Sequence, residues 1–408
     1  MKRSYFRFGA ALFLAGFWMW GSIPAQEQEP RVLNGIDVLR KQNFAPLAGK
    51  RVGLVTNHTG LAADGISTID LLFRSGVCKL AALFSPEHGI RGVEDAKVTT
   101  GVDQATGLPV YSLYGETLRP RPEMLRDIDI LMFDIQDVGA RFYTYSTTMA
   151  YCLEEAARAR IPFYVLDRPN PIDGLAVEGP MLDPDKTSFV GYMPLPVRHG
   201  MTLGELARFF NAEKGLGADL HVISMEGWRR GFLFSETGQL WVNPSPNMRS
   251  LLQAIFYPGV CLLEATNVSV GRGTEKPFEQ IGAPWIEPRR LAAVLQAARV
   301  PGVEFVPVNF TPAASVHRGL PCGGVNLVLT DRSRFQSVLA GLTLISALHR
   351  LYPGKFEIDK VIRLLGNQQA LDALKRGEPP ADILRAADRG APMRAFLSGR
   401  QKALLYER

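Results

Sequence analysis

The sequence predicts an α/β fold built on a parallel β-sheet that helices cover on both faces. Short apolar runs rich in β-branched residues alternate with segments of helical periodicity through the first half of the chain. These runs are almost continuously apolar, as expected for strands that are buried on both sides of a sheet. With 408 residues, the chain is too long for one ordinary hydrophobic core, so we expect more than one domain.

The first half supplies strands and helices in strict alternation. We expect strands at 51–56, 79–84, 128–135 and 163–166, with helices at 67–73 and 145–160. Thr202 and Glu205 form a capping box that opens a helix at 202–214, and a strand at 220–225 follows. The Pro- and Asn-rich stretch 243–249 indicates a loop near the change of domain. Beyond it we expect helices at 289–299 and 334–351, a strand at 324–330 and a mostly helical tail from 358.

The N-terminus has the layout of a secretory signal peptide. Lys2, Arg3 and Arg7 precede an apolar run at 8–20, and Ala25 is a suitable last residue before cleavage. We therefore predict a signal peptide at 1–25, an N-terminal domain at 26–240 and a C-terminal domain at 241–408. The protein is then exported, to the periplasm or the extracellular space, and an uncleaved N-terminal anchor is the alternative. No later run reaches the roughly 18 apolar residues of a membrane span, so we expect no other membrane element.

Charge and cysteine content exclude two classes of function. The formal net charge is +6, and Lys2, Arg3 and Arg7 account for half of it, so the excess left after cleavage is too small to predict nucleic-acid binding. The cysteines lack the close spacing typical of metal sites, and isolated buried thiols are the favoured interpretation. We expect no metal and no cofactor. The sequence makes no prediction about the oligomeric state. The cysteines are Cys78, Cys152, Cys261 and Cys322.

Polar side chains gather where the predicted strands of the first half end. Ligands of open parallel sheets bind outside the carboxyl ends of the strands, so these side chains predict one shared binding site. Ordinary turn chemistry is the alternative, since Asp, Asn and Pro favour turns. The candidate residues are Asn57, His58, Glu87, His88, Asp134, Gln136, Asp137, Arg141, Tyr145, Arg168 and Asn170.

Glu87 is the strongest candidate for a catalytic role. It follows an apolar strand directly, and partial burial of a carboxyl raises its pKa because burial disfavours the charged form. A raised pKa is what a general acid needs near neutral pH. A glutamate that only caps the following turn is the alternative. The neighbouring His88 is expected to contact substrate, tune Glu87 or simply pack.

The second half contributes a polar stretch at 264–275 that contains Asn267, Arg272 and Glu275. It lacks the third glycine and the strand–turn–helix setting of a dinucleotide-binding fingerprint. An arginine flanked by glycines, with amide and carboxylate groups nearby, suits an anionic or hydroxyl-rich ligand. A flexible interdomain loop is the alternative.

Seven stretches of the chain together carry a resemblance to a known family. They include G-L-V-T-N-H-T-G at 53–60, F-S-P-E-H-G-I-R-G at 84–92, N-P-S-P-N-M-R at 243–249 and E-A-T-N-V-S-V-G-R-G-T-E at 264–275. The others lie at 134–145, 166–171 and 198–202. In these stretches the sequence resembles the bacterial exo-β-N-acetylmuramidases of the NamZ type.

The resemblance implies a fold and an activity. The fold would be a Rossmann-like parallel-sheet domain plus a smaller α/β C-terminal domain, with the active site in the interdomain cleft. The activity would be exolytic hydrolysis that releases terminal β-1,4-linked N-acetylmuramic acid from the non-reducing end of peptidoglycan-derived saccharides. Glu87 would be the catalytic acid, and no cofactor would be needed.

The mechanism stays open at the level of sequence. Glycosidases commonly use a second carboxyl, for which Asp137 is the first choice, followed by Asp134, Glu264 and Glu275. The substrate's own N-acetyl group is a further possibility. Muramic acid carries a lactyl carboxylate, so an arginine should bind it. The candidates for that contact are Arg141, Arg168 and Arg272.

Two rival functions also fit the residues. A metal-dependent hydrolase would use His58, Glu87, His88 and Asp134 as ligands, although the tight spacing of known metal motifs is missing. A non-catalytic periplasmic protein that binds sugar or peptidoglycan would also place two α/β lobes around a cleft.

Overall fold

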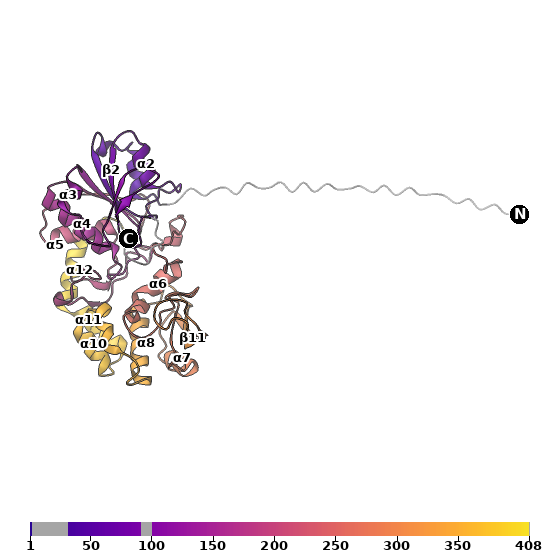
Figure 1. Ribbon diagram of the computed structural model, residues 1–408. Coiled ribbons are helices and arrows are strands. Elements are labelled where there is room, and N and C mark those ends of the chain that lie inside the picture. Colours follow the sequence, from indigo (N-terminus) through magenta and orange to yellow (C-terminus); the bar gives the residue numbers. More distant parts are fainter. Residues whose placement is uncertain (2–31, 91–99, 408) are drawn as a thin grey trace.

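The computed structural model describes Met1 and residues 32–90 and 100–407, so the predicted signal peptide lies outside the described residues. Two lobes follow each other along the chain (Figure 1). The N-terminal lobe contains the large sheet, and the C-terminal lobe contains a small sheet and most of the later helices. In the described part of the chain, no helix has both the length and the apolar character that crossing a membrane requires.

The central sheet is parallel, as predicted, apart from one short strand at its edge. Within the described residues, seven strands pair in the order β3-β4-β2-β1-β5-β6-β9, and β3 is antiparallel to β4. Counted along the chain, the parallel strands lie in the order 3-2-1-4-5-6, which is the doubly wound Rossmann arrangement. The order reverses between β1 and β5, and ligands of such sheets bind beside this point. The strands are β1 (Arg51–Thr56), β2 (Lys79–Ser85), β3 (Gly101–Val102), β4 (Pro109–Ser112), β5 (Ile130–Asp134), β6 (Phe163–Leu166) and β9 (Leu220–Ile223).

Helices cover both faces of this sheet, which explains why its strands are apolar throughout. On one face, Ile36 and Leu72 of the first two helices pack in one core with Leu54 of β1. On the other face, Leu153 and Phe210 of two later helices belong to the larger core. The helices of this lobe are α1 (Gly35–Lys41), α2 (Thr68–Arg74), α3 (Pro122–Leu125), α4 (Tyr145–Ala159) and α5 (Leu203–Glu213), and a small antiparallel pair is formed by β7 (Glu178–Met181) and β8 (Pro196–Arg198).

The C-terminal lobe packs helices against a three-stranded antiparallel sheet of order β10-β12-β11. The expected strand at 324–330 is β12, whereas β10 and β11 were not predicted. The elements are α6 (Leu251–Val260), β10 (Gln280–Ala283), α7 (Pro288–Ala297), β11 (Val303–Phe310), β12 (Cys322–Leu329), α8 (Ser337–Leu351), α9 (Ile362–Leu365), α10 (Gln368–Lys375), α11 (Pro380–Arg389) and α12 (Ala391–Ala403). Short 3-10 helices lie at Ala45–Leu47, Pro184–Lys186, Phe234–Glu236, Cys261–Leu263 and Ile358–Val361.

Helix α6 escaped prediction because Pro258 and Gly259 lie inside it, and both residues normally end helices. The glycine is required by packing. A Cβ atom on Gly259 would lie 1.9 Å from the carbonyl oxygen of Ser337, at the start of α8. The two helices therefore cross at a distance that only glycine permits.

The end of the chain returns to the N-terminal lobe. Helix α12 packs on α5, and α11 packs on β7. The buried Arg400 of α12 donates hydrogen bonds to the carbonyl oxygens of His199, Gly174 and Gly200. The lobes are thus joined by more than the single crossing near residue 250. The four cysteines are free thiols.

Candidate active site

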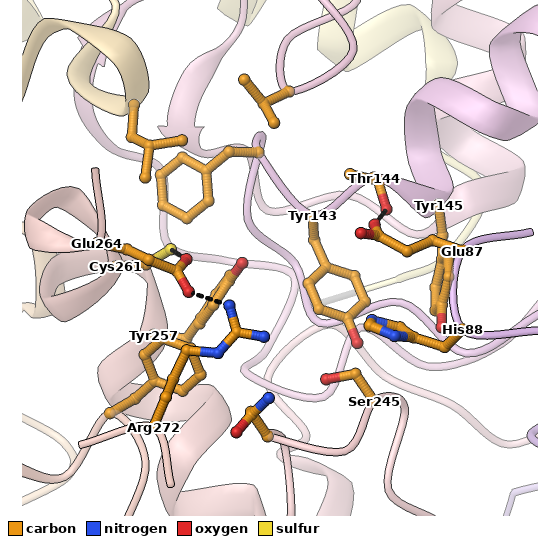
Figure 2. A pocket seen from close by; sticks show the side chains of 15 residues that line it. Glu87, His88, Tyr143, Thr144, Tyr145, Ser245, Tyr257, Cys261, Glu264 and Arg272 are labelled. Atoms are coloured by element: carbon orange, nitrogen blue, oxygen red, sulfur yellow. Dashed lines mark hydrogen bonds and ion pairs between the residues drawn. The ribbon is translucent and has the colours of Figure 1, made fainter. Parts of the chain in front are cut away.

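A cavity of about 150 Å³ lies where the two lobes meet (Figure 2). The N-terminal lobe contributes the loop after β2 and the start of α4, and the C-terminal lobe contributes α6 and the stretch that follows it. The lining residues that carry chemistry are Glu87, His88, Tyr143, Thr144, Tyr145, Ser245, Asn247, Tyr257, Cys261, Glu264 and Arg272.

Glu87 reaches the cavity through a tight turn at the carboxyl end of β2. Its strand ends at Ser85, and Gly89 N then donates a hydrogen bond to Pro86 O. His88 has φ 70° and Gly89 has φ 76°, so both adopt the left-handed conformation that few residues besides glycine favour. The turn directs the half-buried Glu87 and His88 toward the start of α4 (Figure 2).

Thr144 holds the carboxyl of Glu87. Its Oγ1 donates a hydrogen bond of 2.5 Å to Glu87 Oε2. The residues on either side of Thr144 are fixed by their surroundings. The Tyr143 ring packs edge-to-face on Tyr145 at 5.0 Å and on Tyr257 at 5.7 Å between ring centroids. This wall of the cavity is therefore rigidly built.

Tyr145 is fixed by hydrogen bonds as well as by packing. Its hydroxyl donates to Pro244 O at 2.7 Å and accepts from Asn57 Nδ2 at 3.1 Å. The first bond connects the start of α4 to the stretch 243–249. The second places Asn57 directly behind the cavity wall, where it supports Tyr145.

An ion pair forms the opposite wall. Arg272 Nη1 donates to Glu264 Oε1 at 2.7 Å, and Cys261 Sγ donates to Glu264 Oε2 at 3.1 Å. When the amide of Asn247 presents its oxygen to Arg272, that oxygen accepts from Nη2 at 2.9 Å and from Nε at 3.2 Å. The side chains of Arg272 and Glu264 are 27% and 24% exposed, so the pair is partly open to the cavity.

Asp137 lies behind the wall formed by the start of α4. Its Oδ2 accepts a hydrogen bond from Gly139 N, while its buried Oδ1 has no hydrogen-bond partner within the described residues. Burial raises the pKa of Asp137 to about 7. Burial raises the pKa of Tyr143 and of Tyr145, and the nearby charge of Asp137 adds a smaller increase to each. Asp137 is therefore near the site, although it is not among the described residues that line the cavity.

The structure separates the predicted site residues into two groups. Glu87, His88, Tyr145 and Arg272 line the cavity. Glu264, a candidate for the second carboxyl, lines it too. Most of the other candidates use their polar atoms to hold the surrounding loops together. They came from loops that do converge, but their side chains are engaged with the protein itself.

Asp134 and Arg168 pair with each other. Arg168 Nε lies 2.6 Å from Asp134 Oδ1, and the two side chains are 5% and 0% exposed. Thr68 Oγ1 donates to Asp134 Oδ2, and Arg168 Nη2 donates to Leu61 O. This buried ion pair ties the loops after β1, β5 and β6 together, so neither charge remains for a ligand.

Amide and imidazole groups make similar connections between loops. Gln136 Nε2 donates to Pro169 O and to Asp137 O. Asn170 Nδ2 donates to Met201 O. His58 Nε2 donates to Asn243 O at 2.7 Å, and burial lowers the pKa of this histidine.

Arg141 is a structural residue in this arrangement. The side chain is 1% exposed and donates to the carbonyl oxygens of Pro180, Leu195, Leu364 and Leu365. Burial lowers its pKa to about 9. It fastens the loop that leads to α4 onto the end of α9, and its guanidinium is committed to these carbonyls.

Asn267 and Glu275 lie apart from the cavity lining. Asn267 Nδ2 donates to Lys355 O, and its Oδ1 accepts from Glu357 N. The Glu275 side chain is 95% exposed and pairs with Arg249. Of the residues predicted in this stretch, Arg272 and Glu264 reach the cavity.

Sequence reasoning did not select several lining residues, among them Tyr143, Thr144, Ser245 and Asn247. Their positions in the sequence could have indicated four of them. Tyr143 and Thr144 lie between the selected Arg141 and Tyr145, and Ser245 and Asn247 belong to the unusual stretch 243–249. Tyr257 and Cys261 gave no signal, because apolar helices contain many such residues.

The ligand set of the metal alternative is not assembled. His58 is bonded to Asn243 O and Asp134 to Arg168. Among the described residues, no three His, Cys, Asp or Glu side chains are grouped closely enough to hold a metal ion.

Comparisons with known proteins agree with this architecture. Residues 52–252 match a family model described as the N-terminal part of the exo-β-N-acetylmuramidase NamZ, and residues 255–406 match its C-terminal part. The chain is 45% identical to the peptidoglycan β-N-acetylmuramidase NamZ of Bacillus subtilis, over 97% of this chain and 98% of that protein.

Solved structures give the same result. Two DUF1343 family proteins from Bacteroides fragilis superpose with TM-scores of 0.80 and 0.75, at 37% and 32% identity. The alignments cover 93% and 92% of this chain and 100% and 99% of those chains. The chain therefore belongs to the exo-β-N-acetylmuramidase NamZ family, which is a family of glycoside hydrolases.

Proposed function

We propose that this protein is an exo-acting glycoside hydrolase that releases terminal N-acetylmuramic acid from the non-reducing end of peptidoglycan fragments during cell-wall turnover. Membership of the family supports the reaction. The observation that carries the proposal is that Glu87 and Arg272, contributed by different lobes, line one cavity. An acid and a binder of carboxylates are the two groups that this substrate requires.

Glu87 is the general acid in this proposal. It is a half-buried carboxyl, held by Thr144 and flanked by the aromatic wall of the cavity. A protonated glutamate in this position can donate its proton to the glycosidic oxygen as the bond to the sugar breaks.

Arg272 is the residue that we assign to the lactyl carboxylate. Its guanidinium is oriented by Glu264 on one side and by Asn247 on the other. Arginine binds carboxylates through parallel hydrogen bonds of fixed geometry. This contact would favour a muramide over a glucosaminide, which lacks the lactyl group.

For the second catalytic carboxyl, the geometry favours Glu264 over Asp137. Glu264 lines the same cavity as Glu87, from the opposite wall, whereas Asp137 lies behind it. The ion pair with Arg272 requires an ionised Glu264, and a base or nucleophile acts in that form.

The test compares the mature chain from Gln26 with Glu87→Gln on a chromogenic β-N-acetylmuramide and the matching N-acetylglucosaminide. We expect turnover of the muramide with at most a residual rate on the glucosaminide, and a loss on the order of 10³-fold in kcat for Glu87→Gln. Glu116→Gln is the matched control, because its side chain is 92% exposed and lies outside the cavity lining. Activity of Glu87→Gln equal to that of the control would remove Glu87 from the acid role, and a preference for the glucosaminide would overturn the substrate.

The proposal includes export, because the substrate lies outside the cytoplasm. The charged, apolar and small residues of the segment 1–25 support it. N-terminal sequencing of the secreted protein should find Gln26 first, and an intact N-terminus would indicate an uncleaved anchor instead.

A further inference from the structure

Thr144 uses its hydroxyl in an unusual way for a residue at the start of a helix. It is the N-cap of α4, a position where a threonine with an extended backbone normally accepts a hydrogen bond from a backbone N–H of the first turn, but Thr144 has helical dihedrals of φ −66° and ψ −16°. In the part of the chain that the structure describes, the Thr144 side chain makes no such capping bond. It donates instead to Glu87 Oε2, at 2.5 Å.

The direction of this bond assigns a role to each oxygen of the carboxyl. Since a hydroxyl donates to Oε2, that oxygen acts as the acceptor. Figure 2 shows the other oxygen, Oε1, directed away from Thr144. A proton on the Glu87 carboxyl is therefore best placed on Oε1.

We propose that Thr144 is a positioning residue for hydrolysis, one that holds Oε2 of Glu87 so that Oε1 delivers the proton to the glycosidic oxygen. The inference rests on the proposed role of Glu87 as the acid. In the step, the O–H bond at Oε1 breaks, a new O–H bond forms on the leaving oxygen, and the bond from that oxygen to the sugar breaks with its electron pair on the oxygen. The sugar carbon forms its new bond to the attacking nucleophile or water. The electron pair of the broken O–H bond stays on the Glu87 carboxylate.

This arrangement gains strength as the reaction proceeds. Hydrogen bonds to a carboxylate are stronger than those to a neutral acid, so the bond from Thr144 strengthens as negative charge develops on Glu87. The N-terminus of α4, a helix of 15 residues, adds a favourable partial positive charge at the same place. Interactions that strengthen toward the transition state raise kcat rather than binding.

The same fold contains a matched control for this role. Thr202 is the N-cap of α5, and its hydroxyl accepts a hydrogen bond from Glu205 N in a complete capping box. It lies outside the described lining of the cavity. The two threonines share residue type and helix position, and each hydroxyl donates to a carboxylate, which is Glu87 in the cavity for Thr144 and the buried Asp167 for Thr202. They differ in backbone conformation, which is helical at Thr144 and extended at Thr202, so Thr202 alone also caps its helix.

The experiment compares Thr144→Val, Thr144→Ser and Thr202→Val on chromogenic β-N-acetylmuramides. For Thr144→Val we expect kcat to fall about 10- to 100-fold, the worth of a hydrogen bond to a charged group, with KM changed less than about twofold. Thr144→Ser should restore most of the loss. The thermal unfolding midpoint of Thr144→Val should change little, whereas Thr202→Val should lower the midpoint and leave kcat unchanged. Thr144→Ala replaces Thr144→Val if the valine variant does not fold.

A second readout separates positioning of the acid from general damage. A dinitrophenyl leaving group needs little protonation, so the loss in Thr144→Val should shrink on this substrate relative to a methylumbelliferyl one, as it should for Glu87→Gln. The alkaline limb of the pH–rate profile should also move to higher pH, because the carboxylate has lost a donor.

The outcomes distinguish the inference from the proposed function. If Glu87→Gln is inactive and Thr144→Val keeps the kcat of the native protein, or loses activity equally on both leaving groups, the inference fails and the acid role of Glu87 stands. If Glu87→Gln is fully active, both fail. A loss in Thr144→Val that appears only in KM also overturns the inference.

Discussion

The starts of helices α4 and α5 show how differently one fold treats similar groups. At α5, the Thr202 hydroxyl accepts from Glu205 N and donates to Asp167 Oδ2, while Glu205 Oε2 accepts from Thr202 N. At α4, Thr144 has a helical backbone, makes no capping bond with its side chain and donates to Glu87 Oε2. The first set of bonds stabilises the helix, and the second holds a carboxyl in the cavity.

The ion pairs and aspartates of the two regions differ in the same way. Arg230 and Glu205 are 3% and 0% exposed, whereas Arg272 and Glu264 are 27% and 24% exposed. Asp167 accepts hydrogen bonds from Thr202, Gly204 N and Tyr406, whereas Asp137 keeps one buried oxygen without a partner in the described residues.

The comparison teaches that the polar groups available for chemistry are those that the fold leaves partly exposed or incompletely hydrogen-bonded. Buried polar atoms are almost always paired in proteins, so an incompletely paired set near a cavity calls for an explanation. At the start of α5, the carboxylate oxygens of Asp167 and Glu205 are all paired, and these bonds stabilise the fold. Around the cavity, groups of the same kinds, Glu87 beside α4 and Arg272 and Glu264 on the opposite wall, line the space that a substrate would occupy.

The largest effect on stability is expected from Glu205→Ala. The change leaves Arg230 buried without its carboxylate and removes the capping box, so the free energy of unfolding should fall by about 3–5 kcal/mol. Urea denaturation measures this. Glu226→Ala, in the exposed pair with Lys41, is the control and should change stability by less than about 1 kcal/mol. Similar values for both variants would contradict the contrast between the regions.

Asp137→Asn should change how stability depends on pH. The pKa of about 7 in the folded protein exceeds that of an unfolded aspartate, so folding favours the protonated form. Its contribution to stability is therefore present below about pH 4 and is lost as the pH rises to about 7. Asparagine does not ionise, so this loss should be absent in the variant. The free energy of unfolding of the variant at pH 8 should then exceed that of the native protein by up to roughly 4 kcal/mol. Parallel stability curves for the two proteins would contradict the burial of an ionisable Asp137.

Arg272→Ala should change substrate specificity, and its effect in free energy should be smaller than those of Glu205→Ala and Asp137→Asn. Loss of the contact to the lactyl carboxylate should lower kcat/KM on the β-N-acetylmuramide about 10- to 100-fold. The residual rate on the glucosaminide should stay the same, and Arg272→Lys should lie between. The exposed Arg332→Ala serves as the control. An equal loss on both substrates would show that Arg272 supports the cavity rather than the lactyl group.

Local sequence patterns predicted most of the central sheet. Strands β1, β2, β5 and β6 and helices α4 and α5 appear within a few residues of their expected positions, because apolar runs, periodicity and the capping box are local signals. Helix α6 was missed, since the fit of Gly259 against Ser337 is a contact between distant segments.

The sequence by itself determined the order of strands and helices, the polar strand ends and the family. Those features follow from residue type and spacing along the chain. The tertiary structure alone decided which polar residues face the cavity. Arg141 and Arg272 look equally suited to an anion in the sequence, yet one is enclosed by backbone carbonyls and the other opens onto the cavity. The reason is that a side chain's availability depends on partners that lie far away in the sequence, and only folding brings them together.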